Sequence, residues 1–192
     1  MNVLIIYTHP NPNSLNHAIL EQVEQGLKDG NHSYKVIDLY ADNFNPVIVY
    51  NEQKKRRDLE NDEETALYRE LINQADHLIF IYPIWWYALP AMLKGFIDRV
   101  FASGFAYTSA GKIPKGLFTN KSAWVIYTID SPAFFVKLFR KNIEWKVMKE
   151  AILKYCGIKK IKKTMIAGVK NSDLDGRKKW LELIYNEAKI LK

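Results

Sequence analysis

The residues best suited to hold a ligand form the run Pro83-Ile84-Trp85-Trp86-Tyr87. An apolar segment at residues 78–82 precedes this run and predicts a strand buried on both faces of a parallel sheet. An amphipathic helix is expected after it, because apolar side chains recur at i, i+3 and i+4 from Met92 to Phe101. Open parallel α/β sheets bind ligands at the carboxyl ends of their strands. A loop with so much ring surface at such an end favours a flat, partly apolar ligand.

Residues 8–16 form a second candidate binding segment, between an apolar run at residues 3–7 and a segment with one apolar helix face. A strand, a polar loop and a helix N-terminus together bind phosphate, because free N–H groups and the positive end of the helix dipole point at it. The polar side chains that can add hydrogen bonds are Thr8, His9, Ser14 and Asn16. Neither a glycine-rich dinucleotide fingerprint nor a Walker lysine is present. By itself, the loop is equally compatible with a well-capped helix, with Asn13 or Ser14 as the N-cap.

The central stretch carries a longer ordered pattern: Pro83-Ile84-Trp85-Trp86-Tyr87, Pro90, Leu93-Lys94-Gly95-Phe96-Ile97-Asp98-Arg99-Val100-Phe101 and Phe105-Ala106-Tyr107. This pattern resembles the signature of the NAD(P)H:quinone oxidoreductase family, flavoproteins with a flavodoxin-like fold. In that family a His followed five residues later by Ser and then Asn forms the flavin phosphate loop. The resemblance therefore implies that His9, Ser14, Leu15 and Asn16 hold the flavin phosphate. It also implies that residues 83–87 lie along the flavin ring.

A third loop should complete the flavin site after the strand predicted at residues 122–128. In better-known quinone reductases this turn is glycine-rich, and its N–H groups bond the pyrimidine edge of the flavin. Here the turn resembles a sub-branch with Thr-Met-Asp-Thr-Pro in that place, so the candidates are Thr128, Ile129, Asp130 and Ser131. Pro132 has no N–H to donate. Asp130 is the sharper departure, since its carboxylate would lie near an electron-rich ring.

The resemblance implies ping-pong hydride transfer, in which NAD(P)H reduces the flavin and a quinone then takes two electrons. A Tyr and a His that relay charge in mammalian members are replaced here by Phe135 and Lys141. Lys141 could still offer positive charge to a reduced flavin. Of two tyrosines that wall the substrate pocket in those members, Tyr107 is present and the second is Ser109. Tyr107 and Lys141 are therefore the candidate catalytic residues, in a pocket that differs from that of the mammalian members.

Alternatives remain open for cofactor and function. The cofactor is FMN or FAD. Family members that bind FAD often carry a longer insertion between residues 51 and 74 that contacts the adenine, and its shortness here leaves FMN open beside FAD. The alternative function is a regulatory flavodoxin-like ancillary subunit of a potassium-efflux transporter. An electron-carrier flavodoxin is disfavoured, because such carriers are usually acidic whereas this chain has a net charge of +7.

The composition of the 192 residues predicts one domain spanning residues 1–192, long enough to bury a sizeable core. No apolar run approaches the roughly 18 residues that span a bilayer, and no signal peptide is visible at the start, so membrane insertion is not expected. The single cysteine, Cys156, suits the reducing cytoplasm. Its apolar surroundings indicate an inert core residue rather than a nucleophile.

Nucleic acid, metal and hydrolase chemistry are not expected. The basic clusters at residues 54–57 and 159–163 lack the aromatics and glycines of a nucleic-acid reader and are expected to be solvated. The four histidines are scattered, without the spacing of a metal site. The Gly-x-Ser-x-Gly elbow of a hydrolase is missing.

Five alternating strand–helix units predict an α/β fold, a doubly wound parallel five-stranded sheet of flavodoxin-like order with helices on both faces. Strands are expected at residues 3–7, 33–39, 78–82, 122–128 and 163–168, and helices from about residues 15, 62, 92, 145 and 174. Residues 51–61 should be an exposed connection, and the helix at 62–74 should bury Leu67, Leu71 and Ile72. Lys94, Asp98 and Arg99 should lie on the polar side of their helix. A homodimer is expected, because Tyr107 and Phe44-Asn45-Pro46 match segments that complete the partner's active site in the family.

Overall fold

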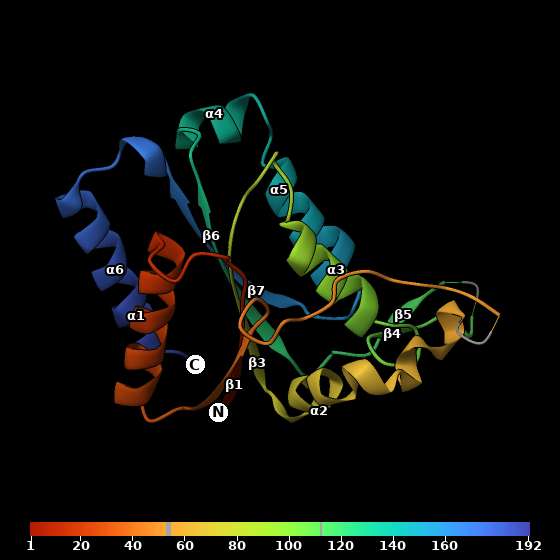
Figure 1. The fold of residues 1–192 in the computed structure, drawn as a ribbon. Helices are drawn as coiled ribbons and strands as arrows, with labels where there is room; N and C mark the ends of the chain where they lie inside the picture. Colours follow the sequence, from red (N-terminus) through yellow and green to blue (C-terminus); the bar gives the residue numbers. More distant parts are fainter. Residues whose placement is uncertain (53–54, 112) are drawn as a thin grey trace.

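The computed structural model describes residues 1–52, 55–111 and 113–192. Its centre is a parallel five-stranded sheet in the order β2-β1-β3-β6-β7 (Figure 1). The strands are β1 (Asn2–Tyr7), β2 (Ser33–Asp38), β3 (His77–Pro83), β6 (Ser122–Ile129) and β7 (Lys160–Ala167). This order confirms the predicted doubly wound α/β architecture. The chain starts at an interior strand, β1; β2 is added on one side of it, and β3, β6 and β7 follow on the other.

The sheet is covered by helices on both faces, and each face has its own apolar core. Helices α1 (Leu15–Asp29) and α6 (Leu174–Lys189) lie together on one face (Figure 1). The other face carries α2 (Ala66–Gln74), α3 (Ala91–Val100), α5 (Ile143–Lys146) and the π-helix η3 (Val147–Lys154). Strand residues divide between the faces by alternation: Ile79 and Ile81 face α1, whereas Leu78 and Phe80 face α3. All seven residues of β3 are buried, as a central strand with two covered faces requires.

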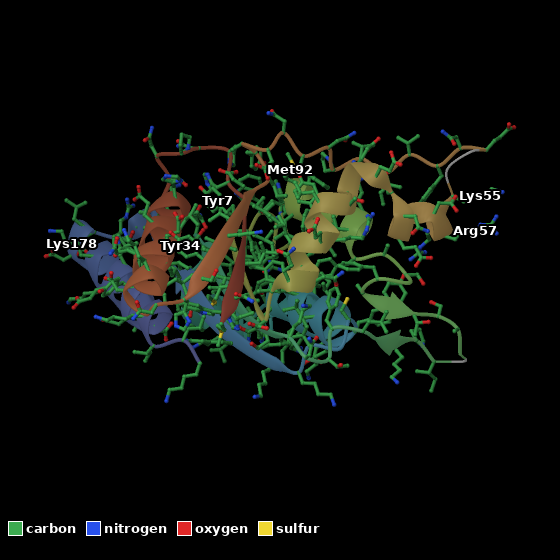
Figure 2. The ribbon with its side chains drawn as sticks, turned by 90° about the horizontal axis from the view of Figure 1, so that it is seen from below. Tyr7, Tyr34, Lys55, Arg57, Met92 and Lys178 are labelled. Carbon is green, nitrogen blue, oxygen red and sulfur yellow. The ribbon has the colours of Figure 1, made fainter. Side chains whose placement is uncertain are left out.

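Short elements complete the chain. They are the 3₁₀ segments η1 (Arg56–Asn61), η2 (Glu63–Thr65) and η4 (Val169–Asn171), the helix α4 (Ala133–Leu138) and the antiparallel pair β4 (Tyr107–Thr108) with β5 (Lys115–Gly116). The β4–β5 pair lies in the connection between α3 and β6. Residues 51–61 are only partly the exposed connection we expected, because η1 forms there and buries Leu59. Figure 2 shows Lys55 and Arg57 at the outer end of this segment, far from Lys178 on α6.

Two side chains lie on the opposite side of their helix from the one predicted. Leu67 is 61% exposed, because the helix begins four residues later than expected, after η2, and Tyr68 and Ile72 take the inward positions. Arg99 is only 3% exposed. Its guanidinium donates to the carbonyl of Asn45 at 2.7 Å, to Asp62 at 3.2 Å and to Glu64. The buried arginine therefore joins α3 to two segments that precede it in the chain.

The segment that contains Asn45 and Pro46 crosses α3 at a glycine. A Cβ at Gly95 would lie 2.3 Å from the Cβ of Pro46 and 2.4 Å from its carbonyl oxygen. Only a glycine allows this close approach without a backbone shift. Phe44, beside it, is buried edge-on against Tyr68 and Phe96.

The two basic clusters differ in their surroundings. Lys54 lies outside the described residues, and Arg57 is exposed as expected. The second cluster is not wholly solvated, because Lys163 is half-buried over the rings of Tyr127 and Trp145. Burial lowers the pKa of Lys163. Within the described part of the chain, no helix is long and apolar enough to cross a bilayer.

Candidate active site

Three loops meet at the carboxyl edge of the sheet, because β1, β3 and β6 are neighbours and parallel (Figure 1). Thr128, at the end of β6, connects all three. Its hydroxyl accepts a hydrogen bond from Asn16 Nδ2 at 2.9 Å, and its carbonyl accepts one from the Ile84 amide at 2.7 Å. The candidate residues of the first, second and third loops are thereby brought to one place.

The first loop ends in a capped helix. Ser14 is the N-cap of α1, in extended conformation, and its hydroxyl accepts from the His17 amide at 3.1 Å. His9 Nδ1 accepts from the Asn11 amide at 3.0 Å. Burial lowers the pKa of His9, so its ring is neutral near pH 7 and the other nitrogen, Nε2, carries the proton and can donate.

This helix end is suited to an anion. The amides of Leu15 and Asn16 have no intrahelical acceptor, as in any first turn. The first turn of α1 contains no acidic residue that would neutralise the helix dipole. Thr8 Oγ1 and Asn16 Oδ1 are buried and have no hydrogen-bond partner within residues 1–52, 55–111 and 113–192. Buried polar atoms of this kind normally have partners, so the loop has hydrogen-bonding capacity left for a ligand.

The second loop is a tight reversal whose tip is aromatic. Trp85 and Ala88 exchange two backbone hydrogen bonds of 3.2 and 2.9 Å, which leaves Trp86 and Tyr87 as the central residues. Both have positive φ, +53° and +56°, as in a type I′ turn. Trp86 is 99% exposed. Edge-on contact between Trp85 and His9, with ring centroids 6.3 Å apart, joins this loop to the first.

The positive φ values are costly for bulky side chains. A left-handed conformation costs a residue with a Cβ about 1–2 kcal/mol, and asparagine or glycine usually occupies such a turn. Strained backbone tends to occur at functional sites. The turn thus places an unburied indole beside the meeting point of the three loops, which we name the crevice, and a flat ring can stack on it there.

The third loop provides backbone donors. Within the described residues, no acceptor takes the amide hydrogens of Asp130 and Ser131, whereas the carbonyls of Ile129 and Ser131 both accept from Gly168. The Ser131 hydroxyl lies 2.7 Å from the Tyr87 hydroxyl, which joins the second and third loops. The side chain of Ile129 is buried in the core and that of Asp130 is exposed. Any ligand contact from Ile129 would therefore be through its backbone.

Arg140 also lies at this site, although the sequence did not single it out. Its guanidinium carbon lies 4.8 Å from the centroid of the Tyr87 ring and 5.6 Å from that of Phe135. One feature of the sequence could have pointed to it: Arg140 follows an aromatic stretch after a central strand, and guanidinium groups, unlike the ammonium group of lysine, stack on aromatic rings. The neighbouring Lys141, which the sequence did single out, is exposed with φ +52°.

Tyr107 is not brought to the three loops of its own chain. It lies in β4, packed edge-on against Tyr155 at 4.9 Å, and its hydroxyl accepts from Arg56 at 3.4 Å. Figure 1 shows the β4–β5 pair near η1, at the other end of the molecule from α4. Its catalytic role stays a prediction, as does that of Lys141.

Cys156 is buried, and burial raises the pKa of its thiol to about 12, so the thiolate nucleophile is absent near neutral pH. In the residues that the structure describes, no group of three or more His, Cys, Asp or Glu side chains is placed to hold a metal ion.

Known proteins resemble this chain in sequence and in fold. The family model described as "Flavodoxin-like fold" matches residues 1–184. The chain belongs to this family. It is also 33% identical over 186 residues to a protein of Haemophilus influenzae named "Uncharacterized NAD(P)H oxidoreductase", which covers 95% of this chain and 92% of that one. Both findings agree with the quinone-reductase resemblance of the sequence.

Two solved structures are similar throughout their length. Smu.1420 from Streptococcus mutans UA159 is 43% identical with a TM-score of 0.93 and full coverage of both chains. The NAD(P)H:quinone oxidoreductase from Methanothermobacter marburgensis is 28% identical with a TM-score of 0.84, covering 98% of this chain and 94% of that one. The crevice of this chain fits a flavin in its phosphate loop, its aromatic tip and its free amides.

Proposed function

We propose that this protein is a flavin-dependent NAD(P)H dehydrogenase of the quinone-reductase type. When bound, the flavin would accept a hydride from NAD(P)H and pass two electrons to a quinone or similar small acceptor. The observation that carries the proposal is the convergence on Thr128 of a phosphate-suited loop, an aromatic tip and a turn with free amides. The names of the oxidoreductase relatives support the same chemistry.

Each loop has a role in this proposal. The amides of Leu15 and Asn16, with Ser14 and the neutral His9, would bind the flavin phosphate. Pro83, Ile84 and the rings of Trp85, Trp86 and Tyr87 would lie along the flavin. The amides of the third loop, from Thr128 to Ser131, would donate to the polar edge of the ring. Lys141 would contribute positive charge nearby, and the cofactor is FMN or FAD.

A steady-state assay tests the proposal. Purified protein loaded with FMN or FAD should oxidise NADH or NADPH when menadione is present, and the flavin-free protein should not. Replacement of Asn16 by Ala should reduce flavin retention, because it removes the link to Thr128. If the flavin-loaded protein does not oxidise either nucleotide with any of several quinones, the proposed activity is wrong. The transporter-subunit alternative receives no support from the relatives described above.

We also propose a homodimer in which Tyr107 of each copy completes the crevice of the other. Tyr107 lies apart from the loops of its own chain, so a second copy is the means by which it could reach a flavin. Equilibrium sedimentation should show a dimer at micromolar concentration, and Tyr107→Phe should change the KM for quinone without changing flavin affinity. A monomer at all concentrations would contradict this arrangement. We further propose one domain for residues 1–192 and, from the single buried cysteine, a cytoplasmic location.

A further inference from the structure

The guanidinium of Arg140 lies against two aromatic rings, one from the second loop and one from α4. It lies over Tyr87, from the aromatic tip, and over Phe135, from α4. Tyr87 is itself fixed by its hydroxyl, 2.7 Å from that of Ser131. A guanidinium that packs its flat face on a ring keeps the N–H groups at its edge available for hydrogen bonds.

The backbone at Arg140 is held in place on both sides. Its amide donates to the carbonyl of Phe135 at 3.2 Å, and the amide of Asn142 donates to Val136 at 3.1 Å. Lys141 and Asn142 then take left-handed conformations, with φ of +52° and +51°, which ends the turn. The position of the guanidinium is therefore set before any ligand arrives, which lowers the entropy lost on binding.

Arg140 contacts rings but no carboxylate in the part of the chain that the structure describes. In the described residues no carboxylate forms an ion pair with it, although the exposed Asp130 belongs to the same connection. Arg99, by contrast, is buried against Asp62 and Glu64. The exposed Lys141, next to Arg140, adds to the positive potential. An unpaired, oriented guanidinium at a crevice edge is suited to a phosphate, which it can bind through two parallel hydrogen bonds.

We propose that Arg140 binds a phosphate group of the nicotinamide dinucleotide and so selects phosphate-bearing reductants over the free nucleoside. This inference rests on the proposed function, since it names what binds at the same crevice. The nicotinamide ring must stack on the flavin to transfer hydride, so the rest of the dinucleotide extends over the crevice edge. There the guanidinium, held on Tyr87, would meet either the pyrophosphate or the 2′-phosphate of NADPH.

A comparison of reductants tests the assignment. NADH and NADPH carry phosphate, whereas dihydronicotinamide riboside presents the same reactive ring without any. Arg140→Ala should raise the KM for the dinucleotides at least tenfold and leave kcat/KM for the riboside within twofold. Arg140→Lys keeps the charge but loses the paired N–H groups of the guanidinium, so its KM for the dinucleotides should lie between those of the wild type and Arg140→Ala. An effect on both NADH and NADPH would identify the pyrophosphate, and an effect on NADPH alone the 2′-phosphate.

Lys137→Ala is the matched control, because it removes the same charge from the same connection; it should change each KM by less than twofold. Equal losses with riboside and dinucleotides in Arg140→Ala, or no change with any of them, would overturn the proposal. A binding measurement separates it from the proposed function. ADP-ribose, followed by tryptophan fluorescence, should bind the wild type at least tenfold more tightly than Arg140→Ala even if the protein fails to turn over. Equal ADP-ribose affinities in the wild type and Arg140→Ala would overturn the role of Arg140 and leave the proposed oxidoreductase function unaffected.

Discussion

Trp86 combines three properties that rarely occur together in one residue. It is bulky and apolar, it is 99% exposed, and it has a left-handed backbone. Exposure of an indole gives up the free energy of burying it, and the positive φ adds about 1–2 kcal/mol of strain. A ligand that covers the ring would recover part of the burial free energy and so offset the strain, which is why the flavin ring is the expected occupant.

Substitution of Trp86 separates stacking from strain. Both Trp86→Ala and Trp86→Gly should weaken FMN or FAD binding ten- to hundredfold, about 1–3 kcal/mol, because each removes the stacking ring. Glycine, unlike alanine, adopts positive φ freely, so the unfolding free energy of Trp86→Gly should exceed that of Trp86→Ala by about 1 kcal/mol. Flavin titration of the apo-protein and urea unfolding measure the two effects. Ile190→Ala, an exposed apolar change at the residue after α6, is the control. Unchanged flavin affinity in both Trp86 variants would show that this loop is not part of the flavin site.

Most candidate residues of the crevice could be predicted from the sequence, because each belongs to a local pattern that indicates the group it would bind. A proline-rich polar loop before a helix indicates a phosphate, and consecutive tryptophans after a buried strand indicate a flat ring. Arg140 could not be found in this way. Its role depends on the distance between its side chain and Tyr87, more than fifty positions earlier, and on the turn that follows α4.

Arg99 shows how one side chain fixes an element in place. Replacement of Arg99 by Ala should destabilise the protein by about 3–5 kcal/mol, because the Arg99 guanidinium is lost from beside the buried carboxylate of Asp62. Lys94→Ala on the same helix is the matched control. Its ion pair with Asp98 is exposed and should contribute less than about 1 kcal/mol. Urea unfolding of the two variants measures both quantities, and similar losses would show that the buried network is not what anchors α3.

His77, at the start of β3, makes stability depend on pH. It is buried with Nδ1 2.7 Å from the Ser122 hydroxyl, and burial, with a smaller contribution from Lys162, lowers its pKa to about 4. The unfolded chain, with an ordinary histidine pKa near 6.5, binds this proton first as pH falls. The folded state therefore loses stability between about pH 6.5 and pH 4, by about 2 kcal/mol at pH 5.

His77→Gln, which cannot titrate but can still bond Ser122, tests this dependence. Its loss of unfolding free energy between pH 7 and pH 5 should be about 2 kcal/mol smaller than that of the wild type, as measured by urea unfolding at both pH values. Equal losses in the two proteins would mean that other groups cause the acid sensitivity.

Element boundaries were harder to predict than element types. The helix expected from residue 62 is preceded by a 3₁₀ turn, which rotates the face and exposes Leu67. The helix expected from about residue 145 is a short α-helix, α5, followed by the π-helix η3, and Tyr155 at its C-terminal end is exposed. In both places tertiary contacts override the 3.6-residue period that a sequence pattern assumes.

At the scale of the molecule, the order of strands was predictable because alternating strand–helix units form a parallel sheet with few possible topologies. The sheet order β2-β1-β3-β6-β7 then brings the loops after β1, β3 and β6 to one edge. The position of Tyr107 could not be predicted from one chain. If it acts in catalysis, its partner groups belong to a second copy.

The absorbance spectrum of the purified protein tests the central claim most directly. The account predicts flavin bands that bleach on addition of NADH or NADPH and return when a quinone is added. Mass analysis of the released cofactor would then identify it as FMN or FAD. A colourless protein that remains colourless after incubation with both flavins would contradict the claim, and would show that the convergence of the three loops serves some other ligand.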